Sequence, residues 1–246
     1  MLFLAYRQWS RAMPWCSFAL SKNIKKMKTK QTIAVIGATG NMGSAISKSI
    51  SKGNYRLLLC SDDKRKGQEL IKNIKSSNQS ADVEVIDCSA EASWQADIII
   101  ADVPYQVEKE VAAKIKEMAN QKIVISITNP LNDTYNGLVT APDTSAAEAL
   151  QKLLPNSKVI KAFNTTFAAD FSKPFIDGKQ VDAFIAGNDE EALRTVSDLV
   201  ATAGFNPIVA GDLSVSRTLE NMQLLLIRLG MKYNYNWLAG WKILHN

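Results

Sequence analysis

The chain has 246 residues, 46% of them apolar, so it is long and apolar enough to bury the core of one α/β domain. Its net charge of +5 comes from residues 1–30, which hold seven basic residues and no acidic one. The remainder has 22 basic against 24 acidic residues, so we expect no nucleic-acid partner. Three scattered cysteines and one histidine, His245, exclude a disulfide framework, a cysteine and histidine metal site, and histidine-based catalysis.

Residues 1–30 form a basic segment whose apolar stretch is interrupted by Arg7, Arg11 and Pro14. It is therefore too broken for a membrane-spanning helix or a secretory signal. A basic leader without acidic residues resembles an organelle transit peptide. Met27, which lies shortly before the first predicted strand, favours instead an upstream extension without a fold of its own and a cytoplasmic protein.

A glycine-rich turn follows the first predicted strand, residues 33–36, and Gly37, Gly40 and Gly43 recur in it at every third position. A helix is predicted from Asn41 onward. This order is typical of a dinucleotide site, because glycines allow a sharp turn, close approach of a diphosphate, and close packing of helix on strand. A Walker-type loop is excluded because no Gly-Lys-Ser/Thr follows. The remaining alternative is a glycine-rich turn in another α/β protein.

The second predicted strand, residues 55–60, is followed by a short polar run, residues 61–66. In a dinucleotide-binding fold the residues at this place bind the adenosine ribose. Asp62 lies about 20 residues past the glycines, where a carboxylate binds the ribose 2′-hydroxyl of NAD. Ser61, Lys64 and Arg65 could instead hold the 2′-phosphate of NADP. The run therefore leaves NADP and NAD both open.

The rest of the chain alternates apolar strands with amphipathic helices, which predicts a Rossmann-type, doubly wound, mostly parallel sheet with right-handed crossovers. This domain is expected over residues 31–212. Ligands of such sheets lie beyond the carboxyl ends of the strands. The predicted strands are 83–87, 97–101, 122–127, 158–163, 182–187 and 206–210, and the predicted helices are 64–75, 107–118, 145–154, 188–203 and 214–229, with an S-x-x-E box at Ser145 and a cap at Asn188.

Two loops at these strand ends, 102–105 and 128–130, are expected beside the cofactor. The second opens a long polar segment, 128–143, which is a candidate functional loop. Tyr105 and Lys109 form the Tyr-xxx-Lys pair of short-chain dehydrogenases. The pair comes one strand too early for that pattern, so an atypical short-chain dehydrogenase is kept only as an alternative.

The C-terminal extension, residues 213–246, combines a helix that is apolar on most sides with an aromatic tail. Such a helix is either buried or forms half of a dimer interface, and we expect a homodimer. The tail could close over a planar substrate or cover the edge of the sheet, and we favour covering. Its aromatic residues are Tyr233, Tyr235, Trp237 and Trp241.

Five stretches together resemble the NADP oxidoreductases that use the deazaflavin coenzyme, and also the cytosolic reductase part of the six-transmembrane metalloreductases. The resemblance covers about residues 31–230, and the pair KAFNT and AFIAGN is its most specific feature. The stretches are IGATGNMG (36–43), SITNPL (126–131), KAFNT (161–165), AFIAGN (183–188) and GFNPIVAG (204–211).

The resemblance implies hydride transfer between NADP, or NAD, and a planar redox acceptor of the deazaflavin, flavin or quinone type. Such transfer requires two rings held face to face, so no catalytic side chain is expected. We also expect no metal site and no membrane partner. Asp62 departs from the family, which usually has an arginine there. The alternative is a sensor or scaffold that binds NAD(P) without turnover. The implied cofactor-binding residues are Gly37, Thr39, Gly40, Asn41, Met42 and Gly43 for the diphosphate, Ser61, Asp62, Lys64 and Arg65 for the ribose end, and Val103, Pro104, Asn129, Pro130 and Asn164 for the nicotinamide.

Overall fold

A computed structural model describes residues 30–245 of the chain. The extension predicted over residues 1–30 therefore lies, apart from Lys30, outside the described residues, and its role stays a prediction. No helix within the described part is long and apolar enough to cross a membrane.

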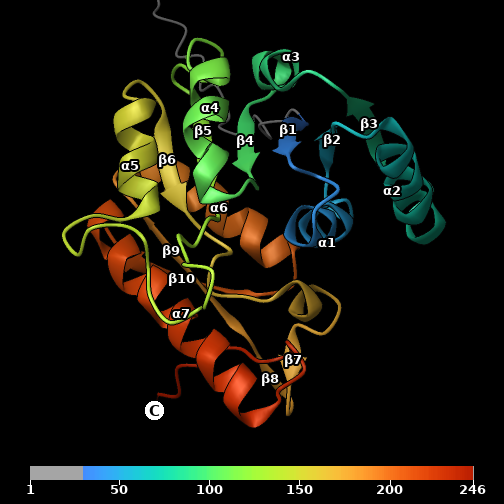
Figure 1. Ribbon diagram of the computed structural model, residues 1–246. Helices are drawn as coiled ribbons and strands as arrows, with labels where there is room; N and C mark the ends of the chain where they lie inside the picture. Colours follow the sequence, from blue (N-terminus) through green and yellow to red (C-terminus); the bar gives the residue numbers. More distant parts are fainter. Residues whose placement is uncertain (1–29, 246) are drawn as a thin grey trace, which may run out of the picture.

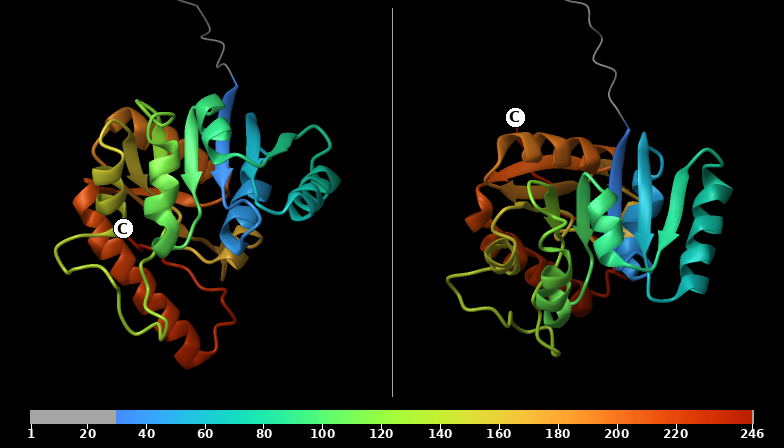
Figure 2. Two further views of the ribbon diagram at one scale, coloured as in Figure 1. Left: turned by 45° about the horizontal axis from the view of Figure 1, so that its top comes forward. Right: turned by 90° about the horizontal axis from the view of Figure 1, so that it is seen from above.

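One eight-stranded sheet organises the fold, and its strands lie side by side in Figure 2. Neighbouring strands are parallel everywhere except between β6 and β9, which confirms the predicted mostly parallel sheet. The first strand, β1, lies between β2 and β4, so the chain order reverses beside it. From one edge to the other the strands are β10 (Asn206–Gly211), β9 (Asp182–Gly187), β6 (Lys158–Lys161), β5 (Ile123–Ser126), β4 (Ile98–Ala101), β1 (Gln31–Ile36), β2 (Tyr55–Cys60) and β3 (Asp82–Ile86).

Helices cover both faces of the sheet because its central strands are apolar on both sides. In β1, Ile33 and Val35 join one core cluster and Ala34 and Ile36 join the other, as the two-residue repeat of a strand requires. The helices α1 (Asn41–Ile50), α2 (Lys64–Ser77) and α6 (Glu190–Thr202) pack on the first face, and α3 (Ser89–Gln95), α4 (Tyr105–Ile115) and α5 (Ala146–Leu153) pack on the second.

The last helix, α7 (Ser216–Tyr233), runs diagonally below the sheet in Figure 1 and leads into the aromatic tail. The tail is attached to β9 through Asp182, whose N–H donates to the carbonyl of Trp241 at 2.9 Å. The carboxylate of Asp182 also accepts from Lys242 Nζ at 2.7 Å. Trp241 thus packs against the sheet as predicted, whereas Tyr235 and Trp237 remain exposed.

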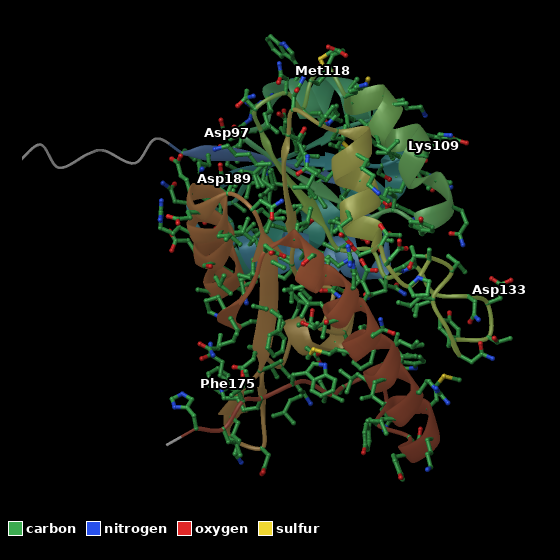
Figure 3. All side chains as sticks on the ribbon, turned by 90° about the vertical axis from the view of Figure 1, so that its left-hand side faces the viewer. Asp97, Lys109, Met118, Asp133, Phe175 and Asp189 are labelled. Carbon is green, nitrogen blue, oxygen red and sulfur yellow. The ribbon has the colours of Figure 1, made fainter. Side chains whose placement is uncertain are left out.

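Most predicted elements are confirmed to within three residues, and the differences have local causes. The helix predicted from residue 107 begins at Tyr105 because Pro104 supplies its N-cap. The cap predicted at Asn188 is wrong: Asp189, labelled in Figure 3, accepts from the N–H of Ala192 at 2.8 Å and caps α6. Asn188 instead accepts from the N–H of Leu213. Helix α3 and the short hairpin β7 (Phe175–Ile176) and β8 (Lys179–Gln180) were not predicted.

Candidate dinucleotide-binding site

The glycine turn between β1 and α1 is held against the end of β4. Gly37 has a φ of +82°, and a Cβ there would lie 1.9 Å from the carbonyl oxygen of Asp102. A Cβ on Gly43 would lie 2.4 Å from the carbonyl oxygen of Gly37. Both positions therefore require glycine for the fold itself.

Gly40 has a different environment, because a Cβ there would have its nearest neighbours at 3.2 and 3.4 Å. Gly40 is the N-cap of α1, which has no side-chain capping hydrogen bond and no acidic residue in its first turn. Apart from Gly43, whose N–H donates to the carboxyl group of Asp102, the backbone N–H groups at the start of α1 therefore face the site without a capping side chain, as an anion site at a helix N-terminus requires.

Two hollows open on either side of this turn, at the carboxyl ends of the strands. The β2-side hollow, of about 830 Å³, lies between the ends of β1, β2, β3 and β4. The β5-side hollow, of about 550 Å³, lies between the ends of β1, β4 and β5. Both are lined by Gly40, Asp102, Val103 and Pro104, so they adjoin each other and together form one cleft at the point where the strand order reverses.

Most of the predicted site residues line this cleft. In the β2-side hollow the Oγ of Ser61 lies 3.0 Å from the Oγ1 of Thr39, so these two hydroxyls form one polar wall. The predicted residues in this hollow are Gly37, Thr39, Gly40, Ser61, Asp62, Val103 and Pro104, and those in the β5-side hollow are Gly40, Asn41, Met42, Val103, Pro104 and Asn129.

Lys64 and Arg65 do not line either hollow. Lys64 forms an exposed ion pair with Asp87 at 2.7 Å, which raises the pKa of the lysine. Arg65 is 95% exposed and faces the outer side of α2. Lys66 lines the β2-side hollow instead. It was not predicted because Lys64, Arg65 and Lys66 are consecutive basic residues, and the sequence does not show which of them turns toward the hollow.

Pro130 and Asn164 are buried behind the wall of the β5-side hollow. The side-chain amide of Asn164 donates to the Oδ1 of Asn129 at 2.9 Å and to the carbonyl of Leu219 at 3.1 Å. Asn129 donates in return to the carbonyl of Asn164 at 3.0 Å. Asn164 therefore meets the hollow through Asn129, and its direct contact with a cofactor stays a prediction.

The Tyr-xxx-Lys pair is not assembled into a site. Tyr105 lines the β5-side hollow, whereas Lys109 is exposed on α4 and lines neither hollow (Figure 3). A short-chain dehydrogenase needs both side chains at the nicotinamide, so the structure gives this alternative no support.

Asp102 at the end of β4 is a site residue that the sequence analysis placed only within a loop. Burial raises the pKa of its carboxyl group to about 6, against a hydrogen bond from the N–H of Gly43 that lowers it. The carboxyl group thus lies beside the N-terminus of α1, where an anion would bind. Its signal in the sequence is an acidic residue directly after an all-apolar strand.

A buried ionic cluster lies behind the β5-side hollow, and the sequence analysis missed it as well. The Nζ of Lys161 donates to the Oε1 of Glu220 at 2.6 Å, and both side chains are fully buried. Lys161 also donates to the carbonyl of Thr128, and Glu220 accepts from the N–H of Ala146 at 3.1 Å. The ion pair therefore binds both ends of the long loop that carries Asn129.

Comparison with known proteins agrees with this geometry. The family model of the F420-dependent NADP oxidoreductases matches residues 32–130. The F420-dependent NADP reductase of Methanocaldococcus jannaschii is 32% identical over 212 residues, which span 82% of this chain and 93% of that protein. The chain belongs to the F420-dependent NADP oxidoreductase family. The predicted resemblance is thus confirmed.

Two further comparisons give the extent of the likeness within this family. A crystal structure of a proposed F420-dependent NADP-reductase from Arthrobacter sp. FB24 superimposes with a TM-score of 0.74 over 87% of this chain and all of that chain. At 22% identity this shows the same fold. Metalloreductase STEAP3 of Rattus norvegicus is 31% identical over 124 residues, which span 49% of this chain but 24% of that protein.

Proposed function

We propose that this chain transfers a hydride between NADP(H) and a deazaflavin coenzyme of the F420 class. The observation that carries the proposal is the cleft across the switch point of the sheet, in a member of this oxidoreductase family. The cleft fits a dinucleotide because its centre is a helix N-terminus without a side-chain cap and because its two hollows extend to opposite sides of that centre.

Three groups of residues are assigned to the three parts of the dinucleotide: the diphosphate, the adenosine ribose and the nicotinamide. The diphosphate lies on the turn and the first helical turn of α1, held by Gly37, Thr39, Gly40, Asn41, Met42 and Gly43. The adenosine ribose and its 2′-phosphate lie in the β2-side hollow, near Ser61, Asp62, Lys64 and Arg65. The nicotinamide lies in the β5-side hollow, near Val103, Pro104, Asn129, Pro130 and Asn164.

Lys64 and Arg65 reach the 2′-phosphate only if their side chains turn toward the hollow. Both side chains are exposed, so such a turn breaks only two surface pairs, that of Lys64 with Asp87 and that of Arg65 with Asp63. Exposed pairs of this kind contribute about 1 kcal/mol or less each. Lys66 lines the hollow already and adds a third cation. Asp62 opposes the phosphate charge and weakens the preference for NADP.

The nicotinamide supplies the hydride when the dinucleotide is bound, and the protein holds the two rings at reacting distance. Val103 and Pro104 give the wall at the centre of the cleft an apolar, rigid surface. The Lys161 and Glu220 pair fixes the loop that carries Asn129 on the opposite wall. Positioning of this kind converts a bimolecular step into an effectively unimolecular one.

Gly40→Val tests the proposal at the diphosphate. Gly40 has an ordinary extended backbone, with φ of −68° and ψ of 171°, so valine fits once the carbonyl oxygen of Gly37, 3.2 Å from the new Cβ, shifts by a few tenths of an ångström. Its methyl groups then occupy the space before the helix N-terminus. We expect NADPH binding, followed by nicotinamide fluorescence, to weaken at least about 100-fold. Gly230→Ala in α7 is the matched control, because its added Cβ has no neighbour within 4 Å. Unchanged NADPH uptake by the folded Gly40→Val protein would contradict the proposal.

A binding protein without turnover is the second candidate, since folds of this type often lose catalysis. The two candidates are separated by supplying NADPH together with deazaflavins, flavins and quinones. Steady oxidation of NADPH with a deazaflavin supports the reductase. Tight NADPH binding without oxidation by any of these acceptors supports the sensor or scaffold.

We also propose that the chain forms a homodimer through the C-terminal part of α7 and the tail. Met231, Tyr233, Tyr235 and Trp237 are between 42% and 57% exposed and follow one another closely in the chain. Contiguous exposed apolar side chains of this kind mark interaction surfaces. Met231→Glu is expected to give a monomer in analytical ultracentrifugation, whereas Val209→Glu on the edge strand β10 leaves the dimer unchanged. The cytoplasmic location stays a prediction from the sequence.

A further inference from the structure

Three charged side chains meet behind the β5-side hollow, and one of them has no role in the function proposed above. Lys161 and Glu220 neutralise each other at 2.6 Å. Glu108, from the first turn of α4, is 2% exposed and lies within the electrostatic reach of both. One cation therefore serves two carboxyl groups, and all three side chains are buried.

The charge of this cluster is balanced only when Glu108 is protonated. Burial raises the pKa of Glu108 to about 7, against Lys161 and a hydrogen bond with Thr128, which lower it, and with Glu220, which raises it further. Tyr105, on the same helix, stays protonated and neutral near pH 7, because burial and the carboxylates of Glu108 and Glu220 raise the pKa of its phenol. Glu108 is therefore the group of this cluster that changes its charge near neutral pH.

The hydrogen bonds of Thr128 lead to the same protonation state by an independent argument. The Oγ1 of Thr128 lies 3.2 Å from the carbonyl oxygen of Val103 and 3.2 Å from the Oε1 of Glu108. One hydroxyl hydrogen cannot be donated to both oxygens. If Glu108 is protonated, it donates to the Oγ1 of Thr128, which then donates to Val103, and both contacts are satisfied.

This short chain of hydrogen bonds ends at the wall of the β5-side hollow. Thr128, Val103 and Tyr105 line that hollow, whereas Glu108 lies behind them. Thr128 thus lines the space assigned to the nicotinamide and its reaction partner, while its hydroxyl contacts a buried carboxylic acid and the carbonyl of Val103, which lines the same space.

We propose that Glu108 is the proton reservoir of the reaction and that the hydroxyl of Thr128 passes its proton to the second substrate. The inference rests on the proposed function. Reduction of a deazaflavin, flavin or quinone needs a proton as well as the hydride. The hydride leaves NADPH, which becomes NADP⁺, and forms a C–H bond, or an N–H or O–H bond, in the acceptor. The proton of Glu108 passes to the hydroxyl of Thr128, whose own hydrogen turns from the carbonyl of Val103 to the acceptor and neutralises the charge that the hydride creates. Solvent in the hollow then restores the proton of Glu108 through the same hydroxyl.

The pH profile of kcat for acceptor reduction tests this role. In the wild type we expect kcat to fall as pH rises through about 7, because Glu108 loses its proton. Glu108→Gln keeps the shape and a hydrogen bond but cannot release a proton. It should lower kcat about 100-fold, remove this limb of the profile and change the solvent isotope effect on kcat, because the proton must then come directly from solvent, with little change in NADPH affinity. Glu117→Gln, an exposed carboxylate just beyond α4, is the control and should behave as the wild type.

Variants of Thr128 keep the test independent of any damage caused at Glu108. Thr128→Val should slow acceptor reduction as strongly as Glu108→Gln, because it removes the hydroxyl at nearly constant volume. Thr128→Ser should restore most of the rate, because it returns the hydroxyl. Equal rates for the valine and serine variants would overturn the relay.

A readout that needs no substrate separates this inference from the proposed function. In carbon-13 NMR of glutamate carboxyl groups we expect one resonance that titrates near pH 7 and is missing in Glu108→Gln. Absence of that resonance, or a Glu108→Gln enzyme with the wild-type pH profile and isotope effect, would overturn the proton reservoir. Failure of the chain to bind or oxidise NADPH would instead overturn the proposed function.

Discussion

The centre of the cleft and the wall behind its β5-side hollow are built from different parts of the chain: the centre from the backbone of one short turn, and the wall from side chains that are far apart in the sequence. Gly37, Gly40 and Gly43 lie within seven consecutive residues and contact one distant residue, Asp102. Lys161 and Glu220 are separated by 59 positions, and Glu220 and Ala146 by 74.

The difference shows where each of these two regions is vulnerable. A backbone site depends on the absence of side chains, so an added methyl group damages it and most charge changes do not. A buried ionic cluster depends on complete pairing, so the loss of one partner leaves an uncompensated charge without water. Substitutions in the two regions should therefore differ in how they can be rescued.

The largest effect is expected for Gly37→Ala. The new Cβ would lie 1.9 Å from the carbonyl oxygen of Asp102, at a backbone φ of +82° that alanine rarely adopts. The turn must move away from β4, so we expect a loss on the order of 4 kcal/mol in the free energy of unfolding, measured in urea. No second substitution in the chain should rescue it. Gly230→Ala, in the exposed part of α7, should instead stabilise the protein by about 0.5–1 kcal/mol.

Removal of the buried cation should come next. Lys161→Met leaves the carboxylate of Glu220 buried and unpaired, and we expect a loss of roughly 3–5 kcal/mol in the free energy of unfolding. Unlike the glycine variant, this one should be rescued in part by Glu220→Gln, which removes the stranded charge. Lys158→Met on the same strand is the control, because its pair with Asp189 is partly exposed and should contribute about 1 kcal/mol or less. Absence of rescue in the double variant would show that the cluster does not act as a charge pair.

The same difference explains what the sequence could predict. The glycine turn was predictable because its spacing is local, and strand β2 was predicted with its observed bounds because YRLLLC is an apolar run between turn signals. The KAFNT stretch was recognised by resemblance, but the burial of Lys161 was not, since its partner Glu220 lies on a helix that meets β6 only in the folded chain. Helix α3 was missed because Ser89–Gln95 is short and has few apolar positions.

One carboxyl group at the centre of the cleft, Asp102, and one behind its β5-side hollow, Glu108, allow a comparison by pH. The pKa of Asp102 is raised to about 6 by burial, so this group is neutral below that pH and negative above it. The diphosphate is negative throughout, and NADPH should therefore bind more weakly as pH rises through about 6. We expect a change on the order of 1–2 kcal/mol, or about tenfold in Kd, by calorimetry. Asp102→Asn should lose this part of the pH dependence and keep only the part that comes from the 2′-phosphate of NADPH, whose second pKa is also about 6, whereas Glu108→Gln should retain the whole wild-type dependence of Kd.

The smallest effect is expected for Asp62→Arg at the outer end of the β2-side hollow. The carboxylate of Asp62 is exposed and lines the space assigned to the 2′-phosphate, so solvent screens its repulsion of that group. Replacement by arginine removes this repulsion and supplies a bidentate phosphate donor. We expect NADPH to bind about fivefold more tightly, which corresponds to about 1 kcal/mol, while NADH, which lacks the phosphate, gains nothing. Glu69→Arg on the outer side of α2 makes the same change in net charge away from the hollow, so an equal gain in that variant would mean that the effect is long-range steering and that the 2′-phosphate does not lie beside Asp62.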